Sequence, residues 1–443
     1  MAKDKKNNNP NLTEISALGT LAAAAGTGTL YATRRFHQDN VDSNKLMFRG
    51  GDGEVGNGNV FNTQRKAWTT LARESGVNAD EYSQNMLYNL SKPVAGGRSG
   101  GSPTAVIDVG SSGVPGRFFG TSLENLVTGL PIYRAGSDLS SGNWINPPLE
   151  NFYKHIPVPS PMHAPKRPVY TRNIVTGGDV LPSEYRAKRD NINVTSIPVS
   201  KTWVEEGLPT TPPANGKVNV FMTAGGGWQY RNVFGKEENI PLGIESIVKS
   251  LDNKYSKSGY SLKILEGHND MNPIRALIRG EASKYPDRVT TLERVKQPEL
   301  KQLFQESDIA IIAPGSTSAE LAAIKGKKPK VVAMAPNMYP HFKENAKWLN
   351  LTGVTTEVMD EAQTLDSEHW AKVFNNLDAA PASTLKSTSA NAGDINNILN
   401  TAKLDLSDEV AKTSRIGKLS ALAGLVGTGL LGANYIKNER QKK

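Results

Sequence analysis

The chain of 443 residues contains no cysteine, and this absence excludes a disulfide framework, a thiolate metal site and a cysteine nucleophile. Aromatic residues make up only 7% of the chain and do not alternate with arginines as in a nucleic-acid groove, so we predict no nucleic-acid partner. The 6 histidines form no i, i+4 pair and have no acidic partner at ligand spacing. We therefore predict no metal site built by the protein and no cofactor.

Long apolar runs are scarce, and the two longest lie at the ends of the chain. Ile15 to Ala32 and Leu419 to Ile436 each extend over 18 mostly apolar or small residues between cationic flanks. A helix of that length spans about 27 Å, which is only just the thickness of a hydrocarbon core. Small residues four apart, as at Ser420, Gly424 and Thr428, allow two helices to approach closely in lipid.

Three interpretations of these end segments compete: a signal peptide for the first one, a pair of membrane helices, and surface helices packed on a partner. A cleavable signal does not explain a matching segment at the other terminus. The net charge of +9 is spread along the chain except at its ends, where cations cluster and suit an anionic membrane surface. We predict membrane association with a cytoplasmic body, and self-association through the terminal helices is the alternative. The clustered cations are Lys3, Lys5, Lys6, Lys437, Arg440, Lys442 and Lys443.

The stretch from Asp308 onward carries the clearest local pattern. Asp308 to Ala313 is an apolar, β-branched run that is typical of a strand buried on both faces of a parallel sheet. A turn with hydroxyl caps, Pro314 to Ser318, leads into helical spacing from Ala319 to Ile324, and Val331 to Ala335 is a second buried strand. Backbone N–H groups at such a helix start favour a diphosphate, so we expect Ser316, Thr317 and Ser318 to bind one and Glu320 to reach a ribose. Gly315 of the same turn is a further candidate binding residue, although a strand, capped turn and helix also recur in sheets that bind nothing.

Three glycine-rich stretches each follow a predicted strand. The strands are Lys45 to Arg49, Ala105 to Val109 and Val218 to Thr223. Because glycine lets the backbone approach a ligand closely, these stretches are candidate substrate loops, although a flexible turn is the commoner reason for glycine enrichment. The candidate binding residues in them are Gly56, Gly58, Gly110, Gly113, Gly225, Gly226 and Gly227.

The sequence Pro-Gly-Ser-Thr-Ser-Ala-Glu at 314–320, followed by His-x-x-Glu-Asn-Ala at 341–346, resembles the donor-sugar half of family 28 glycosyltransferases. This family includes the peptidoglycan N-acetylglucosaminyltransferase and diacylglycerol glycosyltransferases. The three glycine loops and the run Asn193 to Trp203 are similar to it as well. The resemblance implies that Glu320 holds the ribose, that Ser316 and Thr317 hold the diphosphate, and that His341, Phe342 and Asn345 contact the donor sugar.

One position departs from that family. The first loop usually ends in histidine, whereas this chain has Asn59, and asparagine cannot take a proton from an acceptor hydroxyl. We expect a carboxylate to replace it. Asp52, Glu54 and Asp108 are the nearby acids, although acids in such loops commonly order the loop or face solvent, and Asp108 is the candidate general base. Asn59 also keeps open the alternative of a protein of this fold that has lost catalysis. A nucleotide-sugar epimerase is a further alternative, but it needs an acid/base cluster that the sequence does not suggest.

We therefore predict an α/β protein with two Rossmann-like domains facing a cleft, the glycosyltransferase B fold, and hydrophobic helices at both termini. The predicted activity is inverting, metal-independent transfer of a sugar from a UDP-sugar donor to a lipid-linked or membrane acceptor. The alternative is a non-catalytic structural or interaction protein anchored by its termini. The predicted parts are a basic tail and hydrophobic helix at 1–38, an acceptor domain at 39–202 with a proline-rich insertion around 143–168, a linker at 203–217, a donor domain at 218–360, closing helices at 361–412, and a hydrophobic helix with a basic tail at 413–443.

Overall fold

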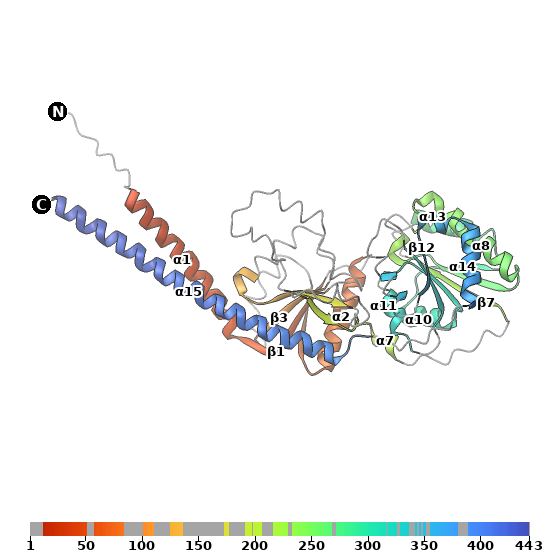
Figure 1. Cartoon of the computed structure of the whole chain (residues 1–443), viewed down its shortest axis with the longest axis horizontal. Coiled ribbons are helices and arrows are strands. Elements are labelled where there is room, and N and C mark those ends of the chain that lie inside the picture. The colour runs from red at the N-terminus through yellow and green to blue at the C-terminus, as the bar shows by residue number, and fades with distance from the viewer. Residues whose placement is uncertain are drawn as a thin grey trace, which may run out of the picture.

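The chain forms two α/β domains, each built on a parallel sheet of six strands (Figure 1). The computed structural model describes residues 12–50, 57–83, 101–109, 125–135, 172–176, 191–196, 198–205, 216–228, 233–267, 272–315, 317–325, 328–335, 342, 345–346, 349–350, 355–379 and 389–442. The fold class predicted from the sequence is therefore confirmed as two Rossmann-like α/β units.

The first sheet has the strand order β2-β1-β3-β4-β5-β6. One face of it is apolar because Leu46 and Phe48 of β1 alternate with residues that point to the other face, and Phe48 stacks on Trp68 of helix α2. The elements are β1 (Val41–Gly50), α2 (Asn57–Glu74), β2 (Asn78–Ser83), β3 (Ser102–Val109), β4 (Ile132–Ala135), β5 (Arg172–Thr176) and β6 (Asn191–Val194).

The second sheet has the order β12-β11-β10-β7-β8-β9, which is the doubly wound Rossmann order. Its central strands are buried on both faces, as the apolar runs in the sequence predicted. The elements are β7 (Val218–Thr223), the short helices η5 (Gly225–Trp228) and η6 (Glu237–Asn239), α8 (Ile240–Tyr255), β8 (Tyr260–Leu265), α9 (Asn272–Ala282), β9 (Val289–Leu292), α10 (Gln297–Glu306), β10 (Ile309–Ile312), α11 (Thr317–Ala323), β11 (Lys330–Met334), β12 (Thr355–Met359), α13 (Glu361–Thr364) and α14 (Ser367–Ala379).

A short helix, α7 (Lys201–Val204), begins the connection between the domains and packs on the second one. Trp203 is fully buried there beside Phe304, with ring centroids 6.2 Å apart. Lys301 donates to the carbonyl oxygens of Thr202 and Glu205 at 2.7 and 2.6 Å. The start of the connection is therefore fixed to the second domain, whereas residues 206–215 lie outside the described part of the chain.

The chain returns to the first domain through helix α15 (Ala392–Lys442). Ile395, Ile398, Leu399 and Ala402 near its start belong to the core of the first domain. The sequence suggested a closing helix near Lys403 and a separate terminal helix from 413, but α15 runs through both without a break. No proline interrupts Lys403 to Ser420, so no residue of this stretch breaks the backbone hydrogen bonding of the helix.

Helix α1 (Leu12–Asp39) lies beside the second half of α15, and both project away from the first domain (Figure 1). At their base, Arg34 donates to Glu409 at 2.5 Å and to Thr413 at 2.8 Å, and all three side chains are buried. Both apolar end segments are thus helical. Within the described residues, no helix is both long and apolar enough to cross a membrane.

Candidate functional site

The second sheet reverses its winding between β7 and β10, and two turns emerge there side by side. Ile312 of β10 pairs with Thr223 of β7, and the Ala313 N–H donates to the Thr223 carbonyl at 3.2 Å. The turn that begins at Gly225 and the turn that contains Gly315 therefore leave the same edge of the sheet. In doubly wound sheets ligands bind at this switch point, outside the carboxyl ends of the strands.

The first of these turns is a tight helical turn, η5, made by Gly225, Gly226, Gly227 and Trp228. Gly225 has a φ of +48°, a conformation that a side chain makes costly, and open space lies where a Cβ would be. Trp228 is fully buried and donates through its indole N–H to the Leu265 carbonyl at 3.1 Å. The tryptophan therefore fixes a turn whose glycine backbone can approach a ligand.

The second turn is held by the segment that the sequence compared with a sugar site. Asn345 is fully buried and donates from Nδ2 to the Pro314 carbonyl at 2.7 Å. Phe342 lies close enough to Gly315 that a Cβ there would be 3.8 Å from its ring. These contacts give Asn345 and Phe342 a role in shaping the turn. Ser316 and His341 lie outside the described residues.

Glu320 occupies the first turn of α11, which starts at Thr317. Glu320 is half-buried, and desolvation by the surrounding protein raises the pKa of its carboxyl to about 8. Across the described residues the carboxyl makes no hydrogen bond and no ion pair. A carboxyl without such partners is able to accept hydrogen bonds from a ligand.

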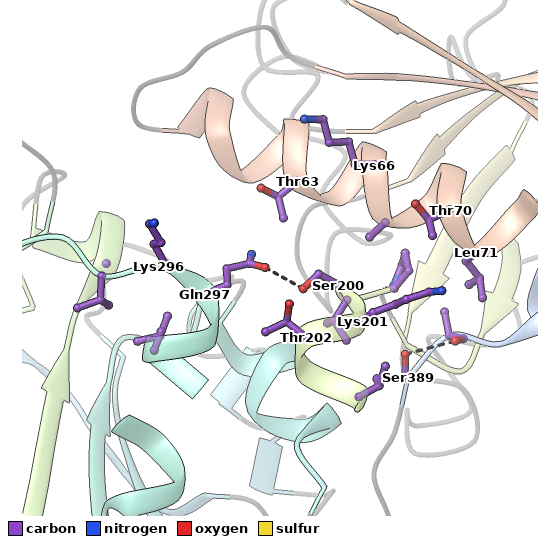
Figure 2. A pocket seen from close by; sticks show the side chains of 18 of the residues that line it. Thr63, Lys66, Thr70, Leu71, Ser200, Lys201, Thr202, Lys296, Gln297 and Ser389 are labelled. Atoms are coloured by element: carbon purple, nitrogen blue, oxygen red, sulfur yellow. Dashed lines mark hydrogen bonds between the residues drawn. The ribbon is translucent and has the colours of Figure 1, made fainter. Parts of the chain in front are cut away.

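A cavity of about 1090 Å³ lies between the domains. Figure 2 shows α2 of the first domain on one side, with Thr63, Lys66 and Thr70, and the connection with Ser200 and Lys201 opposite. Gly225 also lines the cavity, so the turn after β7 joins it to the switch point. The described lining residues include none from the turn after β10. Glu320 is near the cavity only because β10 pairs with β7, whose following turn contributes Gly225 to the lining.

Among the charged residues of the cavity wall, cations outnumber acids. Lys66, Arg294 and Lys296 are exposed lining residues, whereas Lys201 pairs with Glu74 across the domains. The Ser200 hydroxyl donates to Gln297 at 2.8 Å and ties the connection to the start of α10 (Figure 2). A cavity with this charge suits an anionic ligand.

A cluster of two acids and two arginines beside the cavity was not predicted from the sequence. Glu266 follows β8, is 1% exposed, and accepts hydrogen bonds from Arg275 at 2.9 Å and Arg279 at 2.7 Å. Burial pushes the pKa of Glu266 up, but the two guanidinium groups and Thr291 outweigh it and hold the pKa below its usual value. Both arginines also pair with Glu293, which lines the cavity. The spacing of the arginines on α9, i and i+4, was the available signal.

The first sheet reverses between β1 and β3, where Gly50 pairs with Val109. Asp108 is 3% exposed, and its Oδ2 lies 3.5 Å from Nη2 of Arg49 on the neighbouring strand. The candidate base is therefore a member of a buried ion pair. Helix α2 begins at Asn57, so Gly58 and Asn59 belong to its first turn and not to the predicted loop. Asparagine is a favoured residue at such a helix start.

Other predicted residues have no described position. Gly56, Gly110 and Gly113 lie outside the described residues, as do the loops around them and the proline-rich stretch 143–168. Within the described ranges, no group of three or more histidine, aspartate and glutamate side chains is arranged to hold a metal ion.

No family model and no curated protein matches the chain. Among solved structures, a protein described as a UDP-N-acetylglucosamine 2-epimerase from Listeria monocytogenes has a TM-score of 0.50 and 10% identity, covering 82% of this chain and 97% of that chain. The S. aureus MnaA complex with UDP has a TM-score of 0.49 and 13% identity, with coverages of 82% and 97%. The glycosyltransferase of kitacinnamycin has a TM-score of 0.48 and 13% identity, with coverages of 87% and 99%. At 10% identity the likeness to the Listeria protein shows the fold alone, the two-domain glycosyltransferase B arrangement, and family 28 membership stays a prediction.

Proposed function

We propose that this chain transfers a sugar from a nucleotide diphosphate sugar to an acceptor. The observation that carries the proposal is Glu320, a half-buried, desolvated carboxyl beside the switch point with no partner among the described residues. A ribose offers two adjacent hydroxyl groups to such a carboxylate, and the resemblance to family 28 assigns the same role to this position. The Listeria protein, described as acting on UDP-N-acetylglucosamine, supports UDP as the nucleotide.

In this proposal the glycine turn after β7 and the start of α11 bind the diphosphate. Backbone N–H groups of Gly225 to Gly227 and of Thr317 would neutralise charge as the diphosphate leaves. Asn345 keeps the second turn in place through its bond to Pro314. The acceptor hydroxyl attacks the anomeric carbon, the bond from that carbon to the diphosphate breaks, and the configuration inverts. No metal is needed in this scheme.

The acceptor hydroxyl must lose a proton, and Asp108 is the proposed base. Its carboxylate lies at the switch point of the first sheet, where an acceptor would meet the donor across the cleft. The acceptor is proposed to be lipid-linked, with the body on the cytoplasmic side of the membrane, because both terminal helices leave from the first domain (Figure 1). The alternative is a non-catalytic protein of the same fold, favoured by Asn59.

A thermal-shift titration with uridine, adenosine and guanosine diphosphates tests the proposal. A ligand at a hundred times its dissociation constant adds about 2.7 kcal/mol to the free energy of unfolding, so we expect uridine diphosphate to raise the melting temperature clearly. Glu320→Ala should weaken its binding by about 1.5 to 3 kcal/mol through loss of a charge-assisted hydrogen bond.

Glu299→Ala is the matched control, because Glu299 is an exposed acid in the first turn of α10. It should leave nucleotide affinity unchanged in calorimetry. If Glu320→Ala binds as tightly as the wild type, Glu320 is not in the site. If no nucleotide shifts the melting temperature, the non-catalytic alternative becomes the better explanation.

A further inference from the structure

The two terminal helices form one structural unit, which we call the arm: α1 from Leu12 to Thr33 and α15 from Ile416 to Lys442. The helices run antiparallel, and the Ser420 hydroxyl donates to the Ala24 carbonyl at 2.8 Å. The contact is close because it is made by glycine: a Cβ on Gly427 would lie 2.9 Å from Leu21. Each helix therefore covers one face of the other and leaves its remaining faces uncovered.

The uncovered faces of the arm carry large apolar side chains. From Leu419 to Leu430 the apolar residues recur at three- and four-residue spacing and so follow one side of α15. No charged residue occurs in Ile15 to Thr33 or in Leu419 to Ile436, although helices exposed to water ordinarily carry charges. The exposed fractions are 58% at Leu18, 64% at Leu419, 59% at Leu422, 71% at Leu425, 49% at Val426 and 36% at Leu430.

Cations outnumber acids beside this uncharged band, although Glu14 directly precedes it on α1 and Glu439 lies among the cations of α15. Arg415 and Lys418 are exposed on α15 directly before the band, and Lys437, Arg440 and Lys442 follow it on the same helix. Both the start of α1 and the end of α15 lie at the far tip of the arm (Figure 1). The basic residues at the start of the sequence, Lys3, Lys5 and Lys6, precede α1 by a few positions.

The charges decide between two occupants of the arm. A second copy packed side by side in parallel would bring Arg415 and Lys418 against their own equivalents. In the antiparallel orientation they would meet the other end of α15, where Lys437, Arg440 and Lys442 outnumber the acid Glu439. An anionic bilayer has the opposite charge at its surface and an apolar interior of matching character.

We propose that the arm binds an anionic phospholipid bilayer as a pair of helices, with its uncharged band in the apolar layer and its cations at the headgroups. This deepens the membrane part of the proposed function by naming the surface and the lipid charge that it recognises. It does not depend on the sugar chemistry, because the arm contributes no described residue to the cavity between the domains.

The test is cosedimentation of the full chain with vesicles of phosphatidylcholine, with and without about 30% phosphatidylserine, where the anionic vesicles should bind far more strongly. Leu425→Glu should lower partition onto anionic vesicles by about tenfold or more, because it removes a leucine from the apolar layer. Leu404→Glu is the matched control, since Leu404 is 70% exposed on the same helix but lies outside the band. It should bind as the wild type does.

Raising the salt from about 0.1 M to about 1 M shortens the Debye length from about 10 Å to about 3 Å and should weaken binding of the wild type. Equal binding by Leu425→Glu and wild type would overturn the proposal. So would absence of vesicle binding together with a dimer, measured by analytical ultracentrifugation, that Leu425→Glu dissociates. Uridine diphosphate affinity, measured on the same samples, reports separately on the proposed function and should be the same in all variants.

Discussion

The switch points of the two sheets occupy equivalent places in equivalent folds but differ in their charge. In the first sheet the buried carboxylate of Asp108 faces the guanidinium of Arg49, 3.5 Å away and on the neighbouring strand. In the second sheet the carboxyl of Glu320 has no counter-charge among the described residues, and burial raises its pKa to about 8.

Equivalent positions of the two folds therefore differ in how much a bound ligand can stabilise them. A buried ion pair is internally neutral, and removing one member leaves the other uncompensated. An isolated buried carboxyl lowers the stability of its own domain once it ionises, and a ligand that donates hydrogen bonds to it removes that cost. The second switch point therefore has more to gain from a ligand than the first.

The largest expected effect is on the rate of sugar transfer, and it tests whether Asp108 has a catalytic role besides its ion pair with Arg49. If Asp108 is the base, Asp108→Asn should reduce sugar transfer by about 10²- to 10⁴-fold with little change in nucleotide affinity. Transfer is measured from a labelled nucleotide sugar to extracted lipid.

Arg49→Gln is the control for this prediction, because it breaks the same ion pair from the other side. Both variants should lose similar stability in urea denaturation, but only Asp108→Asn should lose turnover. Equal loss of turnover in both variants would make Asp108 a structural partner of Arg49. Wild-type turnover in Asp108→Asn would remove it from the mechanism.

Buried strands of both domains could be predicted from the sequence for a physical reason. Strands such as Ile309–Ile312 and Val218–Thr223 are buried on both faces, so they are recognisable as short apolar runs without knowledge of their neighbours. The pairing of Arg49 with Asp108 depends instead on the register between β1 and β3, which a single sequence does not contain. For the same reason the sequence could suggest Asp108 as a base but not its partner.

Residues of the site that come from separate elements were the hardest to predict. Glu266, Arg275 and Glu293 meet only because β8, α9 and β9 are adjacent in the fold. Asn345 was assigned to the sugar by resemblance, while the structure adds a bond to the Pro314 carbonyl. Local patterns therefore located the turns of the site, and tertiary contacts determined what holds them.

The next expected effect is a pH dependence of the free energy of unfolding, which only the second switch point should cause. The folded chain keeps a proton on Glu320 between its ordinary pKa of 4.5 and about 8, whereas the unfolded chain has released it. Folded protein then binds more protons, so stability falls as pH rises through this window, by at most about 1.4 kcal/mol per pH unit. Glu320→Gln cannot ionise and should remove this fall. The free energy of unfolding, measured by urea denaturation at about pH 5, 6, 7 and 8, would detect the difference.

Glu299→Gln, at an exposed acid, should keep the pH dependence of the wild type. Nucleotide binding provides a second reading, because a ribose that donates to the ionised carboxylate favours the deprotonated form. Affinity for a UDP-sugar should therefore rise between about pH 6 and pH 8 in the wild type and stay level in Glu320→Gln. A wild-type affinity that falls over this range would contradict the role of Glu320 as an acceptor of ribose hydroxyl bonds.

The smallest effect concerns Asn345, which decides whether the second turn is shaped by the protein or by the sugar. Asn345→Ala removes the donor to the buried Pro314 carbonyl, and an unsatisfied buried carbonyl should cost about 1 to 3 kcal/mol of stability. Asn350→Ala is the control, because Asn350 is an exposed residue in the same segment and should change stability by less than about 0.5 kcal/mol. If Asn345→Ala keeps wild-type stability but loses affinity for the UDP-sugar and not for uridine diphosphate, then the side chain acts on the sugar. The second switch point would then use its polar side chains to bind the ligand, whereas the first pairs Asp108 with Arg49 within the protein.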